Sequence, residues 1–521
     1  LNDNREEVRQ IMLNQIRNMS DDEIRETHFY TLTAPTGIGK TLSSLQTALY
    51  LQERIMELEE YTPRIITAIP FINIIEQNKK EYQNVIGDNG TVVIHHRLSD
   101  YSLNEKGREG IPVDTALLET ESWEGDIVLT TFVQLFQSIF SGNNRLLKKI
   151  NKLAGSIVIL DEAQAVPEKY MPLIGATLQM ISKYYGTRFI LMTATQPKLL
   201  EFGNKLLEIE GMKGIADNQI VELLPNHKKY FENLNRTKLV PILDKKINND
   251  EFIDLFFETY KKDKSALIVV NTIKRSINLF NRIKKEVKER SLDVPVYYLS
   301  TNIVPIERKE VIEEVNSLLK QGKPVILVST QTIEAGVDMD FDMGFRDFAH
   351  LDSLIQTAGR VNREGEKGKY FPIYIVQLEN DNHYIYNLSH RQSTMELLTE
   401  KEEILENEYG LLTEKYYSLA LERGVDDEAK EIWEQGIMKL DFDVVEEFQM
   451  IDNLGEIADV YVELDAIASS LADAYEAILN YEDELNYDFS LIFSKEIADK
   501  INRKQNVFER KALLRLVMAK M

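Results

Sequence analysis

Residues 34–41 read APTGIGKT, and this stretch decides the fold. The residues before it, 27–33 (THFYTLT), have the apolar and β-branched character of a buried strand. Residues 42–50 (LSSLQTALY) have the apolar spacing of a helix. The glycines therefore fall at a strand-to-helix turn, which is the setting of a phosphate-binding loop. The sequence predicts that this chain binds a nucleoside triphosphate.

Each part of this loop has a chemical task. Gly37 and Gly39 permit backbone angles closed to other residues, so consecutive N–H groups can face phosphate oxygens. Lys40 is expected to neutralise the outer phosphates, and the Thr41 hydroxyl to bind Mg²⁺. The strict pattern has glycine where this chain has Ala34, and an ordinary glycine turn is the alternative. The predicted nucleotide-binding residues here are Thr36, Gly37, Ile38, Gly39, Lys40 and Thr41.

Composition limits the class of protein. The chain has 521 residues, 43% of them hydrophobic, and no apolar run approaching the length of about 20 residues that spans a bilayer. Cysteine is absent, which excludes disulfides and thiolate metal sites and agrees with a reducing cytoplasm. We therefore expect a cytoplasmic protein with no membrane segment.

Charge is distributed unevenly along the chain. The net charge is −24, and residues 377–521 carry 14 Lys and Arg against 33 Asp and Glu, a net charge of −19. Residues 1–376 are left with only −5. A basic groove for a nucleic acid therefore remains possible in the front part, whereas the acidic part is a poor surface for a DNA backbone.

Short apolar strands alternate with helical stretches from about residue 27 to residue 376, which predicts an α/β fold with parallel sheets. The polar stretch 204–245 has no clear period and separates two such series. After residue 376 the pattern changes to acidic helices, at 394–408 and 467–480, with a strand at 459–463 and a basic helical end at 495–520. The predicted domains are 1–225, 226–376 and 377–521.

The apolar strand 156–160 (SIVIL) ends in Asp161-Glu162-Ala163-Gln164. Acidic residues here emerge at the carboxyl end of a parallel strand, where such sheets bind their ligands. Asp161 is expected to hold Mg²⁺, and Glu162 to orient and deprotonate the attacking water. Thr193 and Thr195 follow another strand, and their hydroxyls can hydrogen-bond this acidic segment, although strand-end capping explains them equally well.

Residues 356–363 (QTAGRVNR) place two arginines three residues apart, which predicts that Arg360 and Arg363 share one helical face. Their guanidinium groups suit a γ-phosphate whose charge grows in the transition state. The competing interpretation is a surface helix with ion pairs. Upstream, Asp338 can face either the ribose or these two arginines.

Hydroxyl, amide and small side chains follow several of the other predicted strands. Such groups, with backbone amides, bind phosphates without reading bases. An ordinary loop explains any one of them as well. The candidate nucleic-acid contacts are Pro70, Gln77, Thr130, Thr131, Asn271, Thr272, Thr330 and Gln331.

Taken in order, APTGIGKT, PFINIIEQN, DEAQ, TATQP, IEAGVD and QTAGRVNR resemble the motif series of superfamily 2 helicases. One branch is more similar, the CRISPR-associated helicase-nuclease of type I interference systems, over about residues 27–364. The resemblance implies two tandem RecA-like parallel-sheet lobes followed by a mainly α-helical acidic C-terminal module. It also implies ATP as the nucleotide, catalytic roles for Lys40 and Gln164, and nucleotide contacts from Gln356 and Asp338.

The resemblance implies an ATP-dependent translocase and helicase that moves 3′ to 5′ on single-stranded DNA after recruitment by a guide-RNA surveillance complex, in antiviral defence. Members of the family carry a metal-dependent HD nuclease domain, yet none of the seven histidines here is followed by Asp. We therefore expect the nuclease outside this sequence, as a removed domain or a separate subunit, and the helicase to be a monomer.

Two other functions stay open at the level of sequence. One is a superfamily 2 helicase or translocase of another pathway, such as an RNA helicase or a restriction motor. The other is an ATP-gated nucleic-acid-binding module that separates no strands. For the acidic C-terminal module we expect a protein-facing or channel-capping role.

Overall fold

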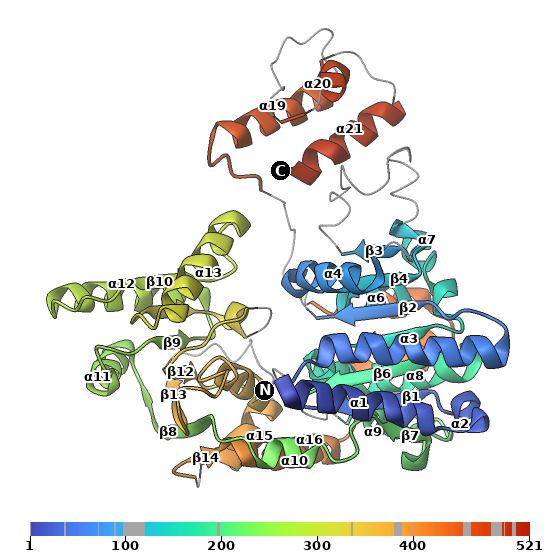
Figure 1. Cartoon of the computed structure of the whole chain (residues 1–521), viewed down its shortest axis with the longest axis horizontal. Helices are drawn as coiled ribbons and strands as arrows, with labels where there is room; N and C mark the ends of the chain where they lie inside the picture. Colours follow the sequence, from blue (N-terminus) through green and yellow to red (C-terminus); the bar gives the residue numbers. More distant parts are fainter. Residues whose placement is uncertain are drawn as a thin grey trace. The chain divides into compact units, whose positions relative to one another are not determined.

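The computed structural model is shown in Figure 1, coloured along the sequence. It describes residues 2–35, 38–70, 72–87, 90–96, 120–194, 198–334, 337–379, 388–399, 401–451, 460–480, 492–493, 495–502 and 507–520. These residues fall into two compact units, one of residues 1–60, 160–182 and 188–430, the other of residues 61–159, 183–187 and 431–521. No helix in the described part of the chain is long and apolar enough to cross a membrane. The predicted domain boundaries stay predictions.

The first sheet has seven strands in the order β3-β4-β2-β5-β6-β1-β7. The strand pairs β1–β6, β1–β7, β2–β4 and β3–β4 are parallel, with Thr33 of β1 opposite Thr193 of β6. Parallel pairing places the carboxyl ends of β1 and β6 at one edge, and the hydrogen bond from Thr193 to Gln164 brings the segment after β5 to the same edge. The strands are β1 (Phe29–Thr33), β2 (Ile65–Ile69), β3 (Val92–His95), β4 (Ile127–Thr131), β5 (Ile157–Leu160), β6 (Arg188–Thr193) and β7 (Ile220–Glu222).

Helices connect these strands, as the alternating pattern predicted. The helix after the phosphate loop is longer than predicted because its apolar spacing continues to a buried Ile55. The helices are α1 (Asn2–Asn18), α2 (Asp21–Glu26), α3 (Lys40–Glu59), α4 (Ile72–Ile86), α6 (Phe132–Ile139), α7 (Asn144–Leu147), α8 (Met171–Tyr185) and α9 (Leu199–Ile209).

The second sheet also has seven strands, in the order β10-β11-β9-β12-β13-β8-β14. Its pairs are parallel except β14–β8, which is antiparallel. Two parallel-dominated sheets with helices confirm the predicted fold class. The strands are β8 (Thr237–Ile247), β9 (Ala266–Val269), β10 (Val296–Leu299), β11 (Ile326–Ser329), β12 (Met343–Asp347), β13 (Phe371–Leu378) and β14 (Ile404–Leu405).

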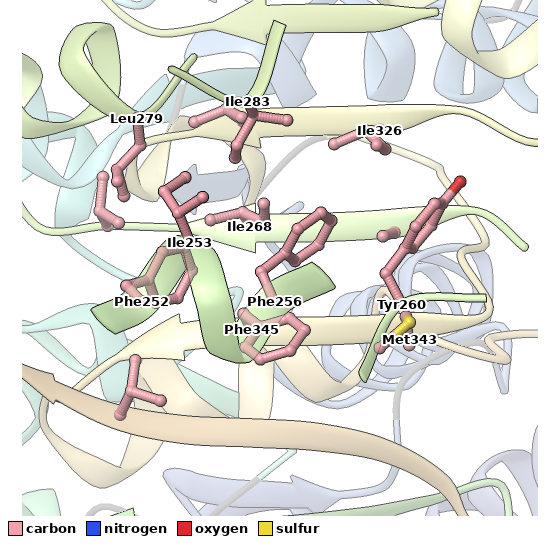
Figure 2. Close-up of a cluster of buried hydrophobic side chains, with 14 of the residues drawn as sticks. Phe252, Ile253, Phe256, Tyr260, Ile268, Leu279, Ile283, Ile326, Met343 and Phe345 are labelled. Carbon is pink, nitrogen blue, oxygen red and sulfur yellow. The ribbon is translucent and has the colours of Figure 1, made fainter. Parts of the chain in front are cut away.

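A large apolar core supports this second sheet (Figure 2). Phe256 lies on α11 (Asn249–Thr259), and its ring meets the ring of Phe345 on β12 edge-on, with 5.4 Å between the ring centroids. Ile268 and Ile326 fill the same layer from neighbouring strands. The helices of this region are α10 (Lys228–Glu232), α11 (Asn249–Thr259), α12 (Ile273–Glu289), α13 (Pro305–Lys320) and α14 (Leu351–Ala358).

The C-terminal part is mainly helical, as predicted. The predicted helix at 467–480 is present as α19, and the basic end forms two helices in the described residues. Apolar residues of α19 and α21, among them Leu471, Ile478 and Val517, share one core. The helices are α15 (Leu388–Leu398), α16 (Tyr409–Glu422), α17 (Asp427–Glu431), α18 (Phe442–Val445), α19 (Ala466–Asn480), α20 (Lys495–Ile501) and α21 (Val507–Lys520).

Two C-terminal predictions were wrong. The helix expected at 394–408 ends at Leu398, and residues 404–405 instead form β14, because their backbone pairs with β8. The strand expected at 459–463 is absent from residues 460–463, and residue 459 lies outside the described part. Alternating apolar residues do not form a strand without a neighbouring strand to pair with.

Candidate active site

The loop between β1 and α3 lies at the carboxyl edge of the first sheet. The N–H of Ala34 donates to the carbonyl of Thr193 (3.1 Å), which ties the loop to the end of β6. Gly39 has a φ of +84°, in the left-handed region that favours glycine, and α3 begins at the next residue. The free N–H groups at the start of α3 can therefore receive phosphate oxygens. Thr36 and Gly37 lie outside the described residues.

The acidic segment after β5 meets the loop through a chain of polar contacts. Nζ of Lys40 lies 3.7 Å from Oε1 of Glu162. Nε2 of Gln164 donates to Oε2 of Glu162 (2.6 Å), and Oγ1 of Thr193 donates to Oε1 of Gln164 (2.7 Å). The predicted contact between the Thr193 hydroxyl and the acidic segment is confirmed, while Thr195 lies outside the described residues. Three loops that are far apart in sequence are thus joined side chain to side chain.

Asp161 and Lys40 are both buried at this site. Burial, followed by the carboxylate of Glu162, raises the pKa of Asp161 to about 7, and Lys40 acts in the opposite direction. Nζ of Lys40 has no hydrogen-bond acceptor in the described structure, only the ion pair with Glu162. The site therefore holds a buried cation and a crowded pair of carboxylates, whose charges a nucleotide and its metal ion would balance.

The oxygen donors present here fit Mg²⁺. Asp161 supplies a carboxylate and Thr41, which is partly buried, a hydroxyl, and Mg²⁺ prefers oxygen ligands of both kinds. In the described ranges there is no cluster of three or more His, Cys, Asp or Glu that could hold a metal ion without a nucleotide. This donor set suits an ion that completes its coordination with phosphate oxygens and water. Ile38 of the loop is buried.

The segment 356–363 does not continue as one helix. α14 ends at Ala358, Gly359 caps it, and Asn362 has a left-handed φ of +44°. The predicted placement of Arg360 and Arg363 on one helical face was therefore wrong. Glycine directly after the last helical residue is a common helix end, and Asn tolerates the left-handed conformation. The two arginines are held by separate contacts.

The guanidinium of Arg360 donates to two backbone carbonyls, from Nε to Ile333 (3.0 Å) and from Nη2 to Glu334 (2.6 Å). Arg363 makes an ion pair from Nε to Oδ1 of Asp338 (2.7 Å). Of the two orientations predicted for Asp338, the structure has the one that faces an arginine. This aspartate is therefore engaged by Arg363.

Electrostatics relates Arg360 to the first sheet's acidic segment. Burial, followed by the charge of Arg363, lowers the pKa of Arg360 to about 10. Three carboxylates act in the opposite direction, those of Asp338, Glu162 and Glu334. Glu162 is therefore close enough for its charge to influence Arg360. Gln356 lies on α14, partly buried, one turn before that arginine.

Four of the predicted nucleic-acid contacts are buried, and three of these, Thr130, Asn271 and Thr330, use their side chains as donors within the protein. Each side chain makes a hydrogen bond to a neighbouring strand or loop, so its polar group is already used within the protein. The bonds run from Thr130 Oγ1 to His95 O (2.8 Å), from Asn271 Nδ2 to Phe348 O (2.9 Å) and from Thr330 Oγ1 to Ser300 Oγ (3.3 Å). Contact between these residues and a nucleic acid stays a prediction.

Two other candidates cap helices. The hydroxyls of Thr131 and Thr272 accept from backbone N–H groups at the starts of α6 and α12, at 3.1 and 3.2 Å. Their positions at helix N-termini are favourable for a phosphate. Pro70 is partly exposed after β2, and Gln331 donates to the carbonyl of Asn271 (3.3 Å). The other candidate, Gln77, lies on α4 with a side chain outside the described set.

Comparison with known proteins gives two family matches. Residues 12–202 match the family described as DEAD/DEAH box helicase, and residues 262–366 match the family described as CRISPR-associated nuclease/helicase Cas3, C-terminal. The CRISPR-associated nuclease/helicase Cas3 of Haloferax volcanii is 30% identical over 452 residues, which cover 71% of this chain and 48% of the relative.

Solved structures show a similar fold. The crystal structure of T. fusca Cas3 with AMPPNP has a TM-score of 0.62 and 17% identity, covering 84% of this chain and 55% of that one. A chain of a pre-nicking CRISPR RNA-guided surveillance complex has a TM-score of 0.56 and 17% identity, covering 81% and 52%. This chain thus spans about half the length of these relatives. From its motifs, its two sheets and these matches, the chain belongs to the Cas3 family of superfamily 2 helicases, and residues 12–202 and 262–366 match the helicase part of that family.

Proposed function

We propose that this chain is an ATP-driven motor that translocates on single-stranded DNA and unwinds DNA in CRISPR defence. The observation that supports it best is the buried Lys40 ammonium, which lies 3.7 Å from Glu162 and has no hydrogen-bond acceptor among the residues that the structure describes. A cation that is desolvated and incompletely paired is costly unless an anion binds it. The γ-phosphate of ATP is such an anion, and it would arrive at the start of α3.

In this proposal the side chains divide the work of hydrolysis. Lys40 binds the outer phosphates, Glu162 orients and deprotonates the attacking water, and Gln164 fixes the Glu162 carboxylate through the 2.6 Å hydrogen bond. Arg360 and Arg363 stabilise the charge that grows on the γ-phosphate. Asp161 and Thr41 would hold Mg²⁺, which when bound neutralises charge on the phosphates.

Closure of the site would couple hydrolysis to movement. Since Thr193 contacts Gln164, a change at the nucleotide can be transmitted to the end of β6. The lobes would then step along the phosphate backbone in the 3′ to 5′ direction, with candidate contacts at the helix starts of Thr131 and Thr272. The direction and the preference for single-stranded DNA follow from the family resemblance.

We further propose that this motor is a cytoplasmic monomer recruited by a guide-RNA surveillance complex. A structural relative is described as part of such a complex, and the relative from Haloferax volcanii is named a nuclease/helicase. None of the seven histidines in this sequence is followed by Asp, so the HD nuclease would act from a segment or subunit outside it. The acidic C-terminal part would face a protein partner rather than DNA.

ATPase assays with single-stranded DNA, duplex DNA and RNA test this function. We expect single-stranded DNA to stimulate turnover most, and Lys40→Ala and Arg363→Ala to abolish the stimulation. Lys213→Ala, at an exposed position of the same lobe, is the matched control and should behave like the wild type. Undiminished turnover in both site variants would refute the assigned site, and stronger stimulation by RNA would favour an RNA helicase. A strand-separation assay distinguishes a motor from an ATP-gated clamp.

A further inference from the structure

A buried ion pair lies next to Arg360 in the second sheet. Arg346, on β12, is fully buried, and its Nη2 lies 3.0 Å from Oε1 of Glu334, which is also buried. Replacing such a pair by apolar residues of similar volume is often neutral or even stabilising. Stability alone is therefore a weak reason for burying two charges here, and their hydrogen bonds indicate a geometric role.

Glu334 joins the turn after β11 to α14. Its Oε1 accepts from the hydroxyls of Ser353 (2.7 Å) and Thr357 (3.4 Å), both on α14. Its backbone carbonyl accepts from Nη2 of Arg360, two residues beyond the end of α14. The side chain of Glu334 thus holds α14, and its main-chain carbonyl holds the guanidinium of Arg360.

Arg346 extends the same network toward the loop after β9. Its Nη1 donates to Oδ1 of Asn271 (2.6 Å), and its Nη2 donates to the hydroxyl of Ser353 (2.7 Å). The carbonyl of Asn271 in turn accepts from the side chain of Gln331 (3.3 Å). Both Asn271 and Gln331 belong to loops proposed to face the nucleic acid. The planar fork of Arg346 therefore bridges these loops and the carboxylate beside Arg360.

We propose that Glu334 and Arg346 form a positioning pair, which holds Arg360 in its catalytic orientation and makes that orientation depend on the loops that contain Asn271 and Gln331. The inference rests on the proposed function and deepens it. Neither residue of the pair touches substrate. The pair transmits nucleic-acid binding into ATP hydrolysis through the two carbonyl contacts of Arg360.

The test compares Glu334→Leu, Arg346→Met and the double variant. Each single variant leaves one buried charge unpaired, so both stability and activity should fall. In the double variant stability should return, but the nucleic-acid-stimulated kcat should stay about 10- to 100-fold below the wild type, as for the loss of groups that orient a catalytic residue. The KM for ATP should change little, because Lys40 is untouched.

Arg346→Lys provides a second variant that keeps the charge opposite Glu334. A lysine has no planar fork, so it cannot bridge Asn271 and Glu334 in the same way. We expect near-normal stability with a reduced ratio of stimulated to basal ATPase. Wild-type stimulation in the double variant and in Arg346→Lys would overturn the positioning role. A wild-type chain without any stimulation would instead overturn the proposed function itself.

Discussion

Helices α8 and α9 touch through two glycines, and Gly175→Ala tests how closely they must pack. A Cβ added at Gly175 would lie 2.0 Å from the carbonyl oxygen of Leu199 and 3.0 Å from the nitrogen of Gly203. Both are backbone atoms, which cannot rotate away. α8 follows the acidic segment and α9 follows the end of β6, so we expect a shift of these helices to disturb the hydrogen bond between Gln164 and Thr193.

The size of the effect follows from these distances. Ordinary contact of a Cβ begins at 3.4 Å, so the two helices would have to separate by about 1.4 Å. Overpacking of this kind costs roughly 1–3 kcal/mol, and more when the backbone has to move. Alanine recovers about 1 kcal/mol through its better helix propensity. We expect a net loss of about 2 kcal/mol or more in the free energy of unfolding, with a lower ATPase kcat.

Urea unfolding followed by circular dichroism measures this loss, with hydrogen exchange used to localise it to α8 and α9. Gly410→Ala is the matched control, because Gly410 is also helical and its added Cβ would meet no atom within 4 Å. The control should be unchanged or up to about 1 kcal/mol more stable. Equal stability of the two variants would refute the reasoning.

Two further predictions concern single polar contacts. Thr193→Val keeps the side-chain shape but leaves Oε1 of Gln164 without its donor, so we expect a kcat about tenfold lower at an unchanged KM for ATP in a steady-state assay. Burial lowers the pKa of His95 to about 3, so the folded protein favours the neutral ring. The free energy of unfolding should therefore keep its full value above about pH 6.5 and fall by roughly 1.4 kcal/mol per pH unit between pH 6.5 and pH 3. Urea unfolding measures the decrease in the free energy of unfolding from pH 6.5 to pH 5, which should be about 2 kcal/mol smaller in His95→Gln than in the wild type. Equal decreases in the two proteins would contradict this assignment.

Most strands were predictable because buried parallel strands are continuous apolar runs. The exceptions were β7, β8, β12 and β14, none of which was predicted. β8 contains Pro241 and three lysines and is partly exposed, so its sequence does not have the pattern of a core strand. β12 (MGFRD) contains Arg346 and Asp347, which are nevertheless buried. Charged residues are normally exposed, and here only partners from other segments make burial possible.

The part of the candidate site that contains Lys40, Asp161 and Glu162 could be predicted from the sequence. Lys40, Asp161 and Glu162 each directly follow a strand or a glycine turn, and parallel topology brings such positions to one edge. The geometry of Arg360 was not readable in this way. A spacing of three residues indicated a shared helical face, but Gly359 ends the helix and backbone carbonyls hold the guanidinium instead.

By itself the sequence determined the phosphate loop, the acidic segment after β5, the two series of parallel strands and the family, because local spacing and strand periodicity carry those features. The tertiary structure decided where charges are buried and which contacts they make. The hydrogen bond from Thr193 to Gln164 joins residues 29 apart in the chain, and Glu334 pairs with Arg346 of another strand and with Ser353 of α14, 19 residues away. A buried charge is stable only when its partners arrive together, and folding alone brings them there.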